Sequence, residues 1–209
     1  MDSRHYNRFA AGDVGRIAAL SDGIFAFAAT VLVLEIHTPE IAAIHSERDL
    51  LAALTGDAPQ LLTWLLSLMT LGIFWVGQQT QLNQLARADR DLSWLHLVFL
   101  AIITVLPFST RLLAEFFEFR TAFVIYWANI LLAGVALYAG WSYASRHDLV
   151  RDPSPEITKA ILKRIVVAQA LYAIGLLAGL VHVEIGIALI ILVQLNYAFA
   201  PRLPWLSKL

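Results

Sequence analysis

Hydrophobic residues fall into six long stretches that short polar segments separate. A helix needs about 20 mostly apolar residues to cross the hydrocarbon core of a bilayer. Five stretches of about that length cover residues 17–36, 60–81, 92–113, 121–143 and 160–181. A shorter sixth stretch covers residues 184–199, after a tight turn with the sequence V-H-V-E. The pattern predicts an all-α integral membrane protein with six transmembrane helices, in a single domain over residues 1–209.

Two of the polar connections are long enough to carry features of their own. Between the first two stretches, Ser46 can cap a helix over about residues 46–55, whose first turn holds Glu47 and Asp49. Its few leucines predict a short interfacial helix rather than a seventh span. The other connection, about residues 144–159, is polar and contains prolines, and it is expected to be a linker.

Basic residues predict the orientation, because cytoplasmic loops carry an excess of lysine and arginine. With six spans, both termini lie on the same side of the membrane. That side carries Arg4, Arg8, Arg16, Arg87, Arg90, Arg146, Arg151, Lys159, Lys163, Arg164, Arg202 and Lys208. The opposite side carries Arg48, Arg111 and Arg120. The asymmetry predicts that both termini are cytoplasmic.

Composition agrees with a membrane protein and gives no support to other classes. Hydrophobic residues make up 59% of the chain and charged residues 15%, against about a quarter charged in soluble domains. A net charge of −1 does not favour a nucleic-acid partner, and the absence of cysteine removes thiol chemistry. No G-x-S-x-G, H-E-x-x-H or Walker-type motif occurs, so we expect neither an enzyme nor a catalytic, cofactor or metal site.

The first apolar stretch contains a charged residue whose direction can be predicted. At about 100° per residue, Leu20, Phe27, Val31 and Leu34 form one stripe of an α-helix. Gly23, Ile24 and Thr30 lie beside this stripe, whereas Asp22 lies nearly opposite, among Ala26, Ala29 and Val33. A carboxylate facing a neighbouring helix needs a hydrogen-bond donor there. The stripe could face lipid, another helix or a pore axis, and periodicity alone does not choose among these.

Three motifs resemble one known family. The segment R-I-A-A-L-S-D contains Arg16, Leu20, Ser21 and Asp22, and F-W follows at Phe74 and Trp75. The third stretch contains W-L-H-L-V-F-L-A-I-I-T-V-L-P-F-S-T. Together they are similar to the R-x-x-x-F-S-D signature and later motifs of the endo-lysosomal transmembrane potassium channel family and its bacterial homologues. Leu20 replaces the usual phenylalanine.

The resemblance implies a potassium-preferring cation channel without a T-V-G-Y-G filter. Bacterial members with one six-helix repeat assemble as homotetramers, so we expect a homotetramer with potassium as the permeant ion in the lipid bilayer of a bacterial inner membrane. The first helix would line the pore, with a hydrophobic constriction at Phe27, Val31 and Leu34 that gates by dewetting. Thr30 matches a threonine linked to potassium preference. Phe27 departs from the usual isoleucine or leucine.

The resemblance also implies a polar network that fixes the first helix against the second and third. Its members would be Arg16, Ser21, Asp22, Trp75 and Gln78. Gln78 stands where the family usually has histidine, and its amide can donate a hydrogen bond to Asp22. His96 could join this network or face solvent or lipid.

The alternative is a proton-coupled secondary transporter, in which Asp22 and intramembrane amides would bind the proton or substrate. The amides are Asn129, Gln169, Gln194 and Asn196. Transporters favour inverted repeats and broken helices; no Gly-Pro pair interrupts a span here, and Pro107 is the one interior proline. We therefore expect the amides to form interhelical hydrogen bonds. The motif formed by Gly175 and Gly179 predicts a close helix contact.

Aromatic residues near the ends of the spans are expected to form belts at the membrane interfaces. They are Phe116, Phe117, Tyr126, Trp127, Trp141 and Tyr143.

Overall fold

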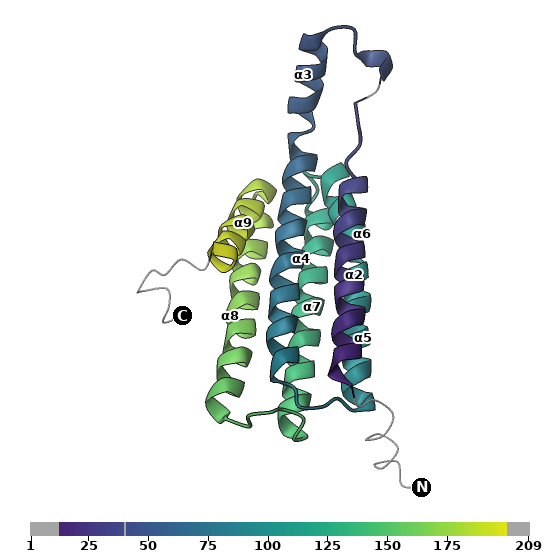
Figure 1. The fold of residues 1–209 in the computed structure, drawn as a ribbon. Coiled ribbons are helices and arrows are strands. Elements are labelled where there is room, and N and C mark those ends of the chain that lie inside the picture. The colour runs from purple at the N-terminus through teal and green to yellow at the C-terminus, as the bar shows by residue number, and fades with distance from the viewer. Residues whose placement is uncertain (1–12, 40, 200–209) are drawn as a thin grey trace.

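The computed structural model of the chain describes residues 13–39 and 41–199, and this part of the chain is helical (Figure 1). Its elements are α2 (Val14–Leu34), η1 (Ile41–Ala43), α3 (Glu47–Gly56), α4 (Ala58–Gln84), α5 (Arg90–Thr104), α6 (Leu106–Glu115), α7 (Arg120–Arg146), α8 (Pro155–Gly179) and α9 (Val183–Phe199). Five helices are long and apolar enough to cross a membrane, when α5 and α6 are taken together. α9 is apolar but has 17 residues, so the sixth span stays a prediction, as does the cytoplasmic location of the termini. Arg4, Arg8, Arg202 and Lys208 lie outside the described residues.

The third span is divided into two helices, although no Gly-Pro pair occurs in it. α5 ends at Thr104 and α6 begins at Leu106, with Pro107 in its first turn. Proline has no N–H, and its ring would clash with the carbonyl of Ile103, four residues earlier, in a continuous helix. Val105 between them keeps a right-handed helical conformation (φ −82°, ψ −15°), so α6 follows α5 without a loop.

The helices form a bundle with α2 at one side and α8 and α9 at the other (Figure 1). α4 packs against both α2 and α9, and α7 packs against α5, α6 and α8. Large apolar side chains fill the space between these helices, including Phe74, Phe99, Phe123 and Ile190. The bundle therefore leaves one long face of α2 uncovered.

α8 and α9 are joined by glycines, as the G-x-x-x-G motif predicts. A Cβ atom added at Gly175 would lie 2.9 Å from Cγ1 of Ile190, and one added at Gly186 would lie 2.6 Å from Cα of Gly179. Larger residues would push the two helices apart, so the motif makes a contact within one chain.

The linker between α7 and α8 is shorter than expected, because α7 continues to Arg146 and α8 begins at Pro155. It is tied to the connection between α4 and α5. The backbone N–H of Ala86 donates to the carbonyl of Leu149 (2.8 Å), and that of Arg151 donates to the carbonyl of Gln84 (2.8 Å). These bonds fix the bundle end that carries most of the basic residues.

A helix is present at the position expected for the interfacial helix. The hydroxyl of Ser46 accepts a hydrogen bond from the N–H of Asp49 (3.2 Å) and caps α3. α3 directly precedes α4 in the chain, lies in line with it, and projects beyond the other helices (Figure 1). None of its side chains is buried. Its location at a membrane surface stays a prediction.

Candidate functional site

The two faces of α2 have different surroundings. Ser21, Phe25, Ala28 and Leu32 are buried against the rest of the bundle, mainly α4, α5 and α6. The predicted stripe lies on the open face: Phe27 is 67% exposed and Leu34 78% exposed. Leu20 is also exposed, and Val31 is half-buried at the edge of the stripe. Packing within the subunit therefore leaves Phe27 and Leu34 without a partner.

Thr30 is exposed on the same open face, between Phe27 and Leu34 in sequence. Its hydroxyl donates a hydrogen bond to the backbone carbonyl of Phe27, at 2.7 Å. Because its hydrogen is used in this bond, the oxygen lone pairs remain free to accept. A hydroxyl held in this way offers an acceptor to a cation.

Asp22 meets its hydrogen-bond donors on α4. Its Oδ1 atom accepts bonds from Nε1 of Trp75 (2.8 Å) and from Nε2 of Gln79 (2.9 Å). Trp75 and Gln79 are four residues apart, and so lie on one face of α4. The pair of bonds ties the N-terminal half of α2 to α4 at the edge of the bundle.

The expected bond between Gln78 and Asp22 is not formed. One residue corresponds to about 100° on a helix, so Gln78 points into the bundle when Gln79 points to α2. Gln78 is fully buried, and its Nε2 lies 3.4 Å from Nδ1 of His96, which is also buried. His96 therefore belongs to the interface between α4 and α5 and not to the Asp22 pair.

Arg16 and Ser21 are not brought into the network. Arg16 is exposed in the first turns of α2 and makes no hydrogen bond or ion pair within the described residues. The Oγ atom of Ser21 is buried without a hydrogen-bond partner there. Of the five expected members, Asp22 and Trp75 are therefore bonded to each other and Gln78 contacts His96 instead. The remaining two, Arg16 and Ser21, belong to neither pair.

Comparison with known proteins places the chain in a family. The family described as "Endosomal/lysosomal potassium channel TMEM175" matches residues 16–107. A potassium channel of Streptomyces collinus is 31% identical over 191 residues, which cover 88% of this chain and 91% of that protein. The chain belongs to the TMEM175 potassium channel family.

A solved structure shows the same fold. The crystal structure of a lysosomal potassium-selective channel TMEM175 homolog from Chamaesiphon minutus matches with a TM-score of 0.78 and 27% identity, over 90% of this chain and 97% of that one. The endosomal/lysosomal proton channel TMEM175 of Gallus gallus is 28% identical over 142 residues, which cover 64% of this chain and 28% of that longer protein. As a member of this family of ion channels, the chain is a multi-pass membrane protein and not an enzyme.

Within this TMEM175 bundle lies a buried hydroxyl cluster that the sequence analysis missed. It consists of Ser67, Thr70, Thr110, Tyr126 and Gln194, from α4, α6, α7 and α9. The hydroxyl of Thr110 donates to that of Ser67 (2.6 Å), and Nε2 of Gln194 donates to the hydroxyl of Thr70 (2.6 Å). The Tyr126 hydroxyl lies 3.0 Å from that of Thr70.

The expected aromatic belt is wrong for two of its residues. Tyr126 and Trp141 are both buried, so they belong to the core and not to a membrane interface.

The signal for the hydroxyl cluster was present in the sequence: Ser67 and Thr70 are three residues apart on α4, and Thr110 ends the L-P-F-S-T motif.

Three of the intramembrane amides bridge pairs of helices, as predicted. Nδ2 of Asn129 donates to the carbonyl of Ile102 (3.1 Å), and Nε2 of Gln169 lies 3.4 Å from the carbonyl of Ile130. Gln194, within the hydroxyl cluster, joins α9 to Thr70 on α4. Within residues 13–39 and 41–199, no three His, Asp or Glu side chains lie close enough to hold a metal ion.

Proposed function

We propose that the protein is a potassium-preferring channel whose pore is formed by the open face of α2 in a symmetric homotetramer. The main support for this proposal is that Phe27 and Leu34 are exposed on a helix whose other face is packed within the subunit. One helix cannot enclose a pore, so several copies must supply it around a symmetry axis. The relatives from Streptomyces and Chamaesiphon are named potassium channels.

The hydrophobic constriction would act as the gate. Between Asp22 and Glu35, α2 contains no charged residue. A ring of Phe27, Val31 and Leu34 side chains would therefore form a narrow apolar neck that water and ions leave readily. Phe27 is the bulkiest of the three and sets the narrowest point.

Selectivity would depend on Thr30, since the sequence contains no T-V-G-Y-G filter. Its hydroxyl oxygen is exposed beside the stripe, with its hydrogen held by the Phe27 carbonyl. Four such oxygens around an axis would offer partial replacement of the water around a cation. Asp22, held by Trp75 and Gln79, has the structural role of fixing the direction of α2.

The transporter alternative is not favoured. The amide nitrogens of Asn129 and Gln194 are engaged in interhelical hydrogen bonds and not directed at a shared site. A channel should pass potassium without a proton gradient, whereas a coupled transporter should not.

The test is potassium flux from proteoliposomes at matched protein density, without a pH gradient. Phe27→Ala should raise basal flux, because it widens and hydrates the neck. The matched control is Val33→Ala, since Val33 is also exposed on α2 but about 120° around the helix from Phe27. Flux that is unchanged by Phe27→Ala but altered by Val33→Ala would place the pore on another face.

A further inference from the structure

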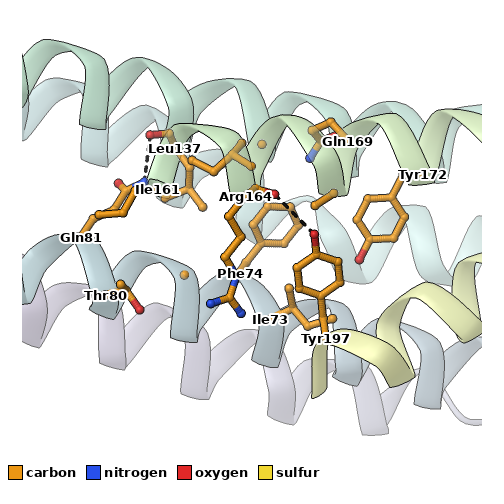
Figure 2. A pocket seen from close by; sticks show the side chains of 14 residues that line it. Ile73, Phe74, Thr80, Gln81, Leu137, Ile161, Arg164, Gln169, Tyr172 and Tyr197 are labelled. Atoms are coloured by element: carbon orange, nitrogen blue, oxygen red, sulfur yellow. Dashed lines mark hydrogen bonds between the residues drawn. The ribbon is translucent and has the colours of Figure 1, made fainter. Parts of the chain in front are cut away.

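A cavity lies between α4, α7, α8 and α9, on the side of the bundle away from α2 (Figure 2). Its volume is about 90 Å³. Phe74, Leu137 and Tyr172 are buried at its floor, whereas Thr80 and Arg164 are exposed at its rim. The cavity therefore opens between α4 and α8, on the outer surface of the subunit.

The cavity is long and narrow. Its lining on α4 extends from Ile73 to Gln81, a rise of about 12 Å at 1.5 Å per residue. Gly77 contributes to its width: an added Cβ atom there would meet only Cδ1 of Leu137, at 3.7 Å. A slot with apolar walls that runs along the helices has the shape and direction of a lipid acyl chain.

A charged side chain lies at the mouth of this slot. Toward the predicted cytoplasmic end, Arg164 extends from α8 across the mouth, and its Cζ atom lies 5.5 Å from the centre of the Tyr197 ring (Figure 2). The guanidinium has no ion pair or hydrogen bond within the described part of the chain, where both ion pairs belong to Arg111. Its five N–H donors are free for an anion.

A second unpaired group lies at the same end. Gln81 is 2% exposed, and its Nε2 donates to the carbonyl of Leu137 (3.2 Å). Its Oε1 atom is buried and has no hydrogen-bond partner among the described residues. A buried acceptor of this kind requires a donor, which protein side chains do not supply here.

We propose that this slot binds an anionic phospholipid of the cytoplasmic leaflet. One acyl chain fills the apolar part between α4 and α8, and the phosphate contacts Arg164. A hydroxyl-bearing headgroup such as that of phosphatidylglycerol supplies the donor for Gln81. Basic sites between helices on the cytoplasmic side suit anionic lipids, and the site does not depend on the proposed pore.

Native mass spectrometry of the full chain in mild detergent tests the headgroup. Phosphatidylglycerol should remain bound, and phosphatidylcholine with the same acyl chains should bind more weakly. Arg164→Gln should weaken phosphatidylglycerol binding about fivefold, the effect of one basic residue near a charged lipid. Lys163→Gln is the charge-matched control, because Lys163 is exposed next to Arg164 but does not line the slot.

Gly77→Leu tests the acyl chain. The leucine would enter the slot, and it should not destabilise α4, because leucine favours helices more than glycine does. We expect an unchanged or raised melting temperature without lipid, and loss of the lipid adduct. Glycerol phosphate, which lacks acyl chains, should not bind.

Three results would overturn the proposal. They are equal binding of phosphatidylcholine, an equal loss in Lys163→Gln and Arg164→Gln, or wild-type lipid binding by Gly77→Leu. Binding of glycerol phosphate as tight as that of the lipid would assign the site to a soluble anion instead.

Discussion

The two faces of α2 are equally apolar in sequence but differ in their surroundings. Leu32 is 1% exposed and packs inside the subunit, whereas Leu34, two residues later, is 78% exposed. Phe25 and Phe27 show the same contrast. The centres of the Phe25 and Phe99 rings are 6.1 Å apart, whereas Phe27 is exposed. One face therefore serves the fold of the subunit, and the other is available to neighbouring copies, ions or lipid.

This contrast separates folding from function along a single helix. In lipid, exposed apolar residues have no driving force to become buried, so close packing and polar contacts decide which face is inside. Substitutions on the buried face should lower stability, and substitutions on the open face should alter permeation.

The largest expected difference is between Leu32→Ala and Leu34→Ala. Leu32→Ala should lower the free energy of unfolding by about 3 kcal/mol, because it leaves a cavity in a packed interface. Leu34→Ala should leave stability unchanged and raise potassium flux. Thermal unfolding in detergent and liposome flux measure the two effects. Equal destabilisation by both variants would remove the distinction between the faces.

An intermediate effect is expected at Asp22, which joins the open edge to α4. Asp22→Leu leaves the donors of Trp75 and Gln79 unpaired. Each unpaired donor should lower the free energy of unfolding by about 1 kcal/mol. Asp22→Asn keeps an acceptor oxygen and should cost less. Native mass should show four subunits in the wild type and fewer intact assemblies in Asp22→Leu.

Ion selectivity provides the control for the Asp22 variants. The channels that survive should keep the wild-type preference for potassium over sodium. A large change of selectivity at normal stability would instead place Asp22 in the ion path.

The smallest effect on stability is expected at Thr30. Thr30→Ala removes the exposed hydroxyl and should reduce the potassium preference a few-fold, the effect of about 1 kcal/mol. Thr30→Ser keeps the hydroxyl and is the matched control. Reversal potentials in potassium and sodium gradients measure the preference. An equal loss in both variants would show that the hydroxyl is not responsible.

Hydrophobic periodicity predicted the apolar helices and the stripe on α2, because both depend on local spacing. It did not place Pro107 at a break, since a proline in a span can be accommodated by neighbouring groups or can divide the helix. The choice between Gln78 and Gln79 as the partner of Asp22 depends on the rotation of α4, which tertiary packing sets.

The hydroxyl cluster was missed for a related reason. Serine and threonine in a helix can bond to their own backbone, so their presence does not reveal a contact between helices. Thr70 does both: its hydroxyl donates to the carbonyl of Leu66 (2.9 Å) and accepts from Gln194. Only the arrangement of α4, α6 and α7 brings Ser67, Thr110 and Tyr126 to the same place.

The bond between Gln194 and Thr70 has a consequence for biosynthesis. It joins residues that are 124 positions apart, so it forms only after α9 has left the ribosome. Until then, a nascent chain carries the other members of the hydroxyl cluster without the Gln194 amide that reaches Thr70 from α9. The polar core is therefore completed only once α9 has been made, and a chain truncated before Gln194 would present an unfinished interior to membrane proteases.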